Sequence, residues 1–110
     1  MKSVTIADAA RADATHITDH YITVAGEEVA SSFTNALDHA LSFIQSSPSA
    51  GSPRLRDTCR RPRLRVWPLT GFPHLVIYDD EPKRILILRI LHAARDIPAS
   101  LREPVQPPDA

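Results

Sequence analysis

The segment that most constrains the fold is an almost uninterrupted apolar run near the C-terminus, ILILRIL at residues 85–91. A run of this kind is typical of a strand in the middle of a sheet, covered on one or both faces. It stops abruptly within RILHAARD, where the polar side chains are those of His92, Arg95 and Asp96. The sequence therefore predicts a central strand with chemically versatile side chains at its end.

Two further strands are predicted just before this run. LRVW, at residues 64–67, alternates polar and apolar residues, and HLVIY, at residues 74–78, is apolar on both faces. The turn residues of 68–73 and the DDEPK connection then join three strands into an antiparallel meander. At the N-terminus the β-branched segment VTIA, residues 4–7, predicts one more short strand.

Two amphipathic helices are predicted between the first strand and the meander. Apolar residues recur at helical spacing from Ala10 to Val24, in a helix that we expect Asp8 to cap and Gly26 to end. A broader apolar stripe runs from Val29 to Ile44 and stops before Pro48. Since only a tight turn separates them, the helices should form an antiparallel hairpin.

These elements predict an α+β fold: an N-terminal strand, then a helical hairpin packed on a mainly antiparallel sheet that ends in a three-stranded meander. The 110 residues suit a single domain, which we place at residues 1–101, followed by a proline-rich, extended tail at 102–110. No apolar run could span a membrane and no signal peptide is recognisable, so we expect a cytoplasmic protein. Cys59, the only cysteine, cannot form an internal disulfide.

Charge is divided unequally along the chain. Residues 1–50 carry a formal charge of −4 and residues 51–110 one of +4, and the predicted loop at 46–63 is rich in arginine. Guanidinium groups bind phosphates and carboxylates, so this polarity favours an acidic protein or nucleic-acid partner. An alternative is that the loop only keeps the chain soluble and pairs with the acidic helices.

Signals for catalysis or metal binding are weak. His16 and His20 share a helix face with Asp13, but this spacing is more typical of a solvated face than of a metal site. Cys59 has no neighbouring catalytic partners, and the scattered glycines cannot form a phosphate loop. We therefore expect no metal and no cofactor. At the strand end, a functional role and a structural Arg95–Asp96 pair remain equally open.

The layout resembles the RelE/ParE superfamily of bacterial toxins from type II toxin-antitoxin modules. The resemblance covers nearly the whole chain and rests on ARADATHITDHYI, LRVWPLTGFPHLVIYDD and above all ILRILHAARDIP. The last of these is similar to the motif with which the ParE branch ends its final strand, with His92, Arg95 and Asp96 in place. The resemblance implies the toxin component of such a module.

The superfamily includes two modes of action. RelE-type members are ribosome-dependent mRNA endonucleases that use lysines, arginines and a C-terminal tyrosine. Here no lysine lies between Lys2 and Lys83 and no tyrosine follows Tyr78, so only Arg95 matches that set. ParE-type members instead bind and inhibit DNA gyrase, and the resemblance therefore implies a non-enzymatic gyrase inhibitor. A RelE-like nuclease and a non-toxic degenerate member remain the alternatives.

The resemblance also implies a cognate antitoxin that wraps around the toxin in a hetero-oligomer. We assign the candidate target-binding or toxicity surface to Arg63, Arg65, His92 and Arg95. The candidate antitoxin-binding residues are Phe33, Leu37 and Phe43, which we expect the sheet to leave uncovered, together with Arg54, Arg56, Arg60 and Arg61. Direct nucleic-acid binding is a less favoured alternative.

Overall fold

The computed structural model describes residues 1–102 of the chain. Its elements, in order, are β1 (Ser3–Ile6), α1 (Asp8–Ala25), α2 (Glu27–Ser46), the short 3-10 helix η1 (Pro48–Ala50), α3 (Arg56–Cys59), β2 (Leu64–Pro68), β3 (His74–Asp80), β4 (Arg84–His92) and α4 (Ile97–Arg102). The predicted tail at 102–110 lies outside the described residues except for Arg102, which belongs to α4.

The four strands form one sheet in the order β1-β4-β3-β2. β2, β3 and β4 are antiparallel neighbours, as the meander predicted, and β1 pairs in parallel with β4. The apolar run of β4 therefore lies inside the sheet, which confirms the prediction of a central strand. A parallel pair needs a long crossover connection, and the segment that begins with the helical hairpin and includes β2 and β3 provides it.

β1 covers only part of the edge of β4. Ile6, the last residue of β1, lies opposite Ile87, whereas β4 continues to His92. The backbone amide of Ala7 still bonds to the carbonyl of Ile87 at 2.9 Å, and α1 begins at the next residue. Beyond this point no strand of the described residues lies on the outer side of β4, so other groups must satisfy its backbone.

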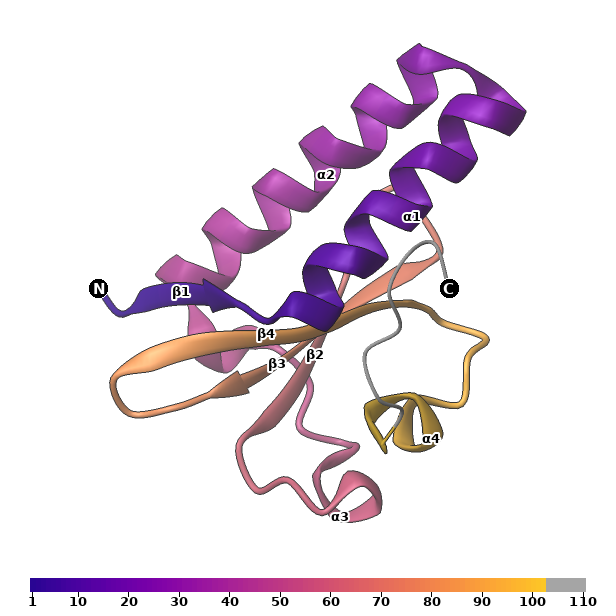
Figure 1. Cartoon of the computed structure of the whole chain (residues 1–110). Helices are drawn as coiled ribbons and strands as arrows, with labels where there is room; N and C mark the ends of the chain where they lie inside the picture. Colours follow the sequence, from indigo (N-terminus) through magenta and orange to yellow (C-terminus); the bar gives the residue numbers. More distant parts are fainter. Residues whose placement is uncertain (103–110) are drawn as a thin grey trace.

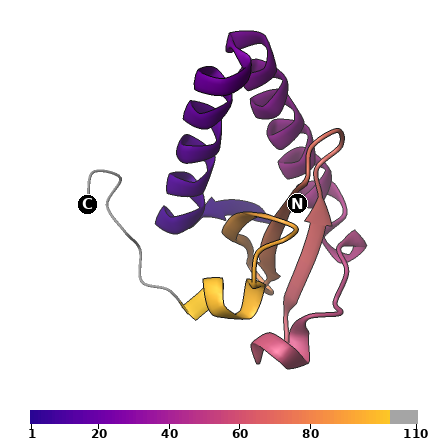
Figure 2. The ribbon, with the colours of Figure 1, turned by 90° about the vertical axis from the view of Figure 1, so that its right-hand side faces the viewer.

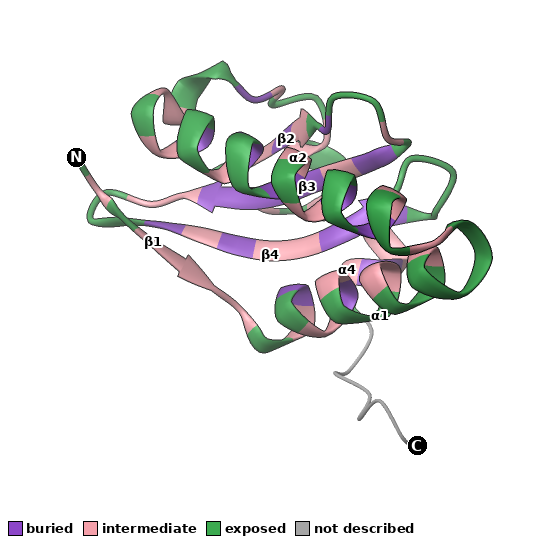
Figure 3. Cartoon of the chain, turned by 90° about the horizontal axis from the view of Figure 1, so that it is seen from above, coloured by how far each residue is buried: buried purple, intermediate pink, exposed green. Residues whose placement is uncertain are grey.

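The helical hairpin lies on one face of the sheet, with α1 and α2 side by side (Figure 1). Gly26 joins the helices with a φ of 94°, a conformation that favours glycine, so the predicted boundary is confirmed. The predicted cap is wrong: Ala7 is the N-cap and Asp8 lies in the first turn, where its charge favours the helix dipole. Seen from above, the outer surface of the hairpin is exposed, β3 beneath it is mostly buried, and β4 alternates between buried and intermediate residues (Figure 3).

A second layer of helix covers the other face of the sheet, where the sequence predicted only a loop and an extended tail. α3 and α4 contact each other below the strands (Figures 1 and 2). Here Ile97 of α4 packs against Leu64, Val66, Ile77 and Leu91 of the sheet, with Leu55 and Cys59 beside α3. Helices of four and six residues are too short to show a periodic pattern, so the prediction failed there.

Candidate functional site

The RILHAARD motif forms the end of β4 and the turn that leads into α4. His92 accepts a hydrogen bond on Nδ1 from the amide of Ala94 at 3.0 Å, and its carbonyl accepts one from the amide of Arg95 at 2.9 Å. The carboxylate of Asp96 accepts a bond from the amide of Ala99 at 3.0 Å. Asp96 thus caps α4, and the motif holds the exposed His92 and Arg95 on a short, ordered turn.

His92 lies opposite His74 on β3, with the two ring centroids 5.6 Å apart. His74 is buried against Tyr21 and Phe33, and its Nδ1 finds no hydrogen-bond partner among the described residues. Burial and, second, the charge of His92 lower the pKa of His74 from its ordinary value. The inner histidine of the pair is therefore neutral at physiological pH, and the outer one faces solvent.

Asp13 and Arg89 form an ion pair that the sequence analysis missed. Arg89 donates from Nε to the Asp13 carboxylate at 2.7 Å and from Nη2 at 2.9 Å, and its Nη1 donates to the carbonyl of Ser100 at 2.8 Å. The same carboxylate accepts a bond from the amide of Ile90 at 3.0 Å, on the edge of β4 that β1 leaves uncovered. A lone arginine within ILILRIL was the only signal of this link.

Asp13 lies in a different environment from the two histidines with which the metal-site alternative groups it. His16 and His20 are exposed, whereas Asp13 is buried and bound to Arg89. Among residues 1–102, no three His, Cys, Asp or Glu side chains are grouped closely enough to hold a metal ion. Asp13 therefore serves the fold through its ion pair with Arg89, and the two exposed histidines do not join it in a group of possible metal ligands within the described residues.

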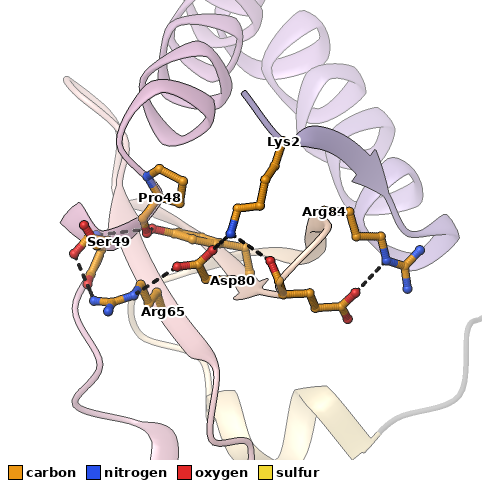
Figure 4. Close-up of polar contacts among 9 residues, drawn as sticks. Lys2, Pro48, Ser49, Arg65, Asp80 and Arg84 are labelled. Atoms are coloured by element: carbon orange, nitrogen blue, oxygen red, sulfur yellow. Dashed lines mark hydrogen bonds and ion pairs between the residues drawn. The ribbon is translucent and has the colours of Figure 1, made fainter.

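Arg65, expected on the target surface, is instead largely inside the fold (Figure 4). Its Nη1 donates to the carbonyls of Ser49 and Gly51 at 2.9 and 2.7 Å, and its Nε lies 4.0 Å from the carboxylate of Asp80. Asp80 also binds Lys2, and the Tyr78 hydroxyl donates to the carbonyl of Pro48 at 2.6 Å. Arg65 therefore fastens the segment after α2 to β2.

The remaining target candidates are separated by the sheet. Arg63 immediately precedes β2, whose first residue, Leu64, pairs with Asp79 at the far end of β3. His92 pairs with His74 at the opposite end of that strand. His92 and Arg95 therefore form one candidate surface, and Arg63 belongs to another.

The arginine-rich segment also divides into structural and exposed residues. Arg56 donates from Nε to the carbonyl of Leu64 at 2.9 Å, and Arg61 donates from Nη2 to the carboxylate of Asp79 at 2.7 Å. The hydrogen bond to Asp79 raises the pKa of Arg61, so Arg61 stays protonated. Arg54, Arg60 and Arg63 are exposed.

An apolar groove lies between α2 and β2. Phe43 is 37% exposed, and its ring centroid lies 4.7 Å from that of Trp67. They line a hollow of about 500 Å³ with Ala36, Ala40, Pro68 and Thr70 among its other walls. The expectation that the sheet leaves Phe33 and Leu37 uncovered is wrong, because both are buried in the core between hairpin and sheet; of the three predicted apolar residues, Phe43 alone lines the groove.

Comparison with known proteins agrees with this geometry. The family model described as "ParE toxin of type II toxin-antitoxin system, parDE" matches residues 4–97. Among solved structures, the chain is similar to one described as "Chromosomal ParDE TA system from P. aeruginosa", with a TM-score of 0.70 and 28% identity over 84% of this chain and 96% of that chain. Comparison with curated proteins finds no match.

No helix in the described part of the chain is both long and apolar enough to cross a membrane.

The region matched by the family model begins in β1 and extends to the first residue of α4, so it includes the hairpin, nearly the whole sheet and the RILHAARD motif. The chain therefore belongs to the ParE toxin family of type II toxin-antitoxin systems.

Proposed function

We propose that this protein is a toxin that binds and inhibits DNA gyrase, and that a cognate antitoxin neutralises it by direct binding in the bacterial cytoplasm. Family membership supports the first part, because inhibition of gyrase is the activity that the ParE resemblance implies. The solved relative, described as a ParDE toxin-antitoxin system, supports the second.

The main support for inhibition by binding, rather than for cleavage of RNA, is that the cationic side chains on β2, β3 and β4 are already engaged in contacts within the fold. Arg65 is held by backbone carbonyls, Arg84 by Glu81 at 2.6 Å, and Arg89 by Asp13. These are all the lysines and arginines of β2, β3 and β4. A metal-independent nuclease needs cations and an acid-base pair at the scissile phosphate, and these residues are already engaged in the fold. Inhibition by binding requires no such set.

We place the contact with gyrase at His92 and Arg95. Both are exposed, and the turn that carries them is fixed by backbone bonds on one side and by the cap of Asp96 on the other. A rigid strand end loses little conformational entropy on binding, so it suits a recognition surface.

We place the apolar anchor of the antitoxin in the groove between α2 and β2. Phe43 and Trp67 offer aromatic surface in a hollow large enough for one or two side chains, and large aromatic side chains often dominate protein interfaces. An otherwise disordered antitoxin segment would gain affinity by burying apolar residues there.

A supercoiling assay with purified gyrase and the full chain tests the proposal. We expect the protein to block supercoiling of relaxed plasmid and to leave plasmid cleaved after denaturation. Ribosomes translating a defined message serve as the parallel reaction. Cleaved message with normal supercoiling would replace the proposal with a RelE-like nuclease. If expression of the chain without antitoxin did not slow growth, the toxin proposal itself would be refuted.

A further inference from the structure

We propose that an arginine face on the α3–α4 layer, made of Arg60, Arg63 and Arg102, binds the phosphate backbone of duplex DNA. All three side chains are exposed. Within the described residues none of them takes part in a side-chain hydrogen bond or an ion pair, unlike Arg56 and Arg61 beside them.

Two hollows connect the three arginines. One, of about 330 Å³, lies between α3 and α4 and is lined by Arg60 on one side and Arg102 on the other. The second, of about 460 Å³, lies between the end of α3 and the β3–β4 connection, and Arg60 and Arg63 line it. Arg60 therefore lines both hollows, and one other exposed arginine lines each of them: Arg102 the first and Arg63 the second.

The backbone of Arg60 adds a separate observation. Arg60 ends α3 in the left-handed conformation, with φ 55° and ψ 42°, and is the only residue other than glycine with positive φ in the described chain. Glycine is the favoured residue at such a helix end, because any side chain strains this conformation. The side chain of this strained arginine has no hydrogen-bond or ion-pair partner among residues 1–102, which points to a use for that side chain.

The chemistry of the face fits nucleic acid better than protein. The large apolar side chains that are exposed in the described chain are Met1, Ile22, Val24 and Phe43, and all lie on other elements. Protein interfaces usually have an apolar or aromatic core, whereas interfaces with nucleic acid are polar and strongly positive. The acidic helical hairpin lies on the other side of the sheet. The carboxylates of Asp79 and Glu81 also line the second hollow, but each is paired with an arginine, Arg61 and Arg84 respectively.

The same residues favour the backbone of a duplex over single-stranded bases. Neither α3 nor α4 contains an aromatic residue on which a base could stack, and Trp67 packs on Phe43 elsewhere. Guanidinium groups instead bind phosphates bidentately. The choice of DNA rests on the proposed function, because the proposed target, gyrase, acts on duplex DNA.

Salt dependence of binding to a fluorescein-labelled duplex of mixed sequence tests the inference, with fluorescence anisotropy of the full chain as the measurement. Three phosphate contacts predict a slope of about −2.7 in log K against log salt, or a loss of about 40-fold between 50 and 200 mM salt. Arg60→Gln should reduce the slope by about 0.9. Arg11→Gln, an equal change of charge at an exposed site on α1, should leave it unchanged.

Arg60→Gly separates a ligand-binding role from a structural one. Glycine relieves the strain at the end of α3, so the variant should unfold at a higher urea concentration than the wild type. It should nevertheless bind the duplex as weakly as Arg60→Gln. Wild-type affinity in Arg60→Gly would show that the arginine serves no ligand and would refute the inference.

Three other results would also overturn it: no binding of the duplex at 50 mM salt, equal loss in Arg11→Gln and Arg60→Gln, or displacement of the duplex by polyglutamate as readily as by unlabelled DNA. Supercoiling assays on the same variants keep the two proposals apart. Inhibition of gyrase without DNA binding refutes only the arginine face. Salt-dependent DNA binding without inhibition of gyrase supports the face and counts against the proposed function.

Discussion

At the scale of single residues, Asp13 connects α1 to β4 and, through Arg89, to α4. Its carboxylate accepts bonds from the guanidinium of Arg89 and the amide of Ile90, and Arg89 continues to the carbonyl of Ser100. One side chain on α1 thus closes the bare edge of β4 and, through Arg89, fixes α4. The sequence could not show this, because the two partners lie 76 residues apart and meet only once the fold has formed.

Asp13→Asn should destabilise the protein by about 3 kcal/mol, because it leaves the charge of Arg89 largely buried without its counter-ion. Urea unfolding followed by circular dichroism gives the free energy of unfolding. Asp19→Asn, at an exposed site on the same helix, should change it by less than about 0.5 kcal/mol. Equal effects of the two substitutions would mean that the ion pair contributes nothing specific.

His74 predicts a dependence of stability on pH. Burial lowers its pKa in the folded state below the ordinary value of 6.5, so the unfolded chain binds a proton first as the pH falls. The contribution of His74 is therefore complete above pH 6.5 and is lost as the pH falls below it, by at most about 1.4 kcal/mol per pH unit. Between pH 8 and 5, the plot of the free energy of unfolding against pH should be flatter for His74→Gln than for the wild type. His39→Gln, at an exposed site on α2, should retain the wild-type slope.

At the scale of elements, the sequence predicted the helices and strands that have a clear pattern of apolar residues and missed the short helices that have none. The apolar stripes from Ala10 to Val24 and from Val29 to Ile44 gave α1 and α2, and the run at 85–91 gave β4. α3 and α4 were missed because helices of four and six residues, fewer than two turns each, carry no measurable period, and packing under the sheet decides their conformation. The candidate site divides in the same way. His92 and Arg95 were predicted as candidate site residues from a sequence motif. The structural role of Arg65 depends on contacts that the sequence does not reveal.

Ile97→Ala tests the packing of α4. Ile97 is 6% exposed and belongs to the cluster on the lower face of the sheet, so its truncation should cost about 3 kcal/mol. Ile22→Ala removes the same atoms from a side chain that is 46% exposed on α1 and should cost less than about 1 kcal/mol. If thermal and urea unfolding gave similar losses for both, α4 would not be docked on the sheet.

At the scale of the whole molecule, the two faces differ in chemistry. The hairpin side carries the acidic helices and the apolar groove of Phe43 and Trp67, and the α3–α4 side carries exposed arginines. A protein with this division can engage a partner on each side without competition for the same groups.

Phe43→Ser tests the protein-binding side. Loss of an aromatic anchor from an interface commonly costs about 2 kcal/mol, so affinity for the cognate antitoxin should fall about 30-fold in calorimetric titration. Ile22→Ser makes a comparable change at the exposed tip of the hairpin and should leave the affinity unaltered. Equal affinities of all three proteins would place the antitoxin elsewhere on the toxin.

The pairing of β1 with β4 has a consequence for the making of the toxin. The first strand of the chain finds its partner only in the last, and Lys2 binds Asp80 and the carbonyl of Glu81 just before that strand. While the chain is being synthesised, the N-terminal strand and the hairpin have no sheet on which to settle. Because the sheet cannot form until β4 has left the ribosome, a nascent chain that ends before β4 cannot adopt the fold described above. Every surface that depends on the assembled sheet therefore first exists when synthesis has passed β4.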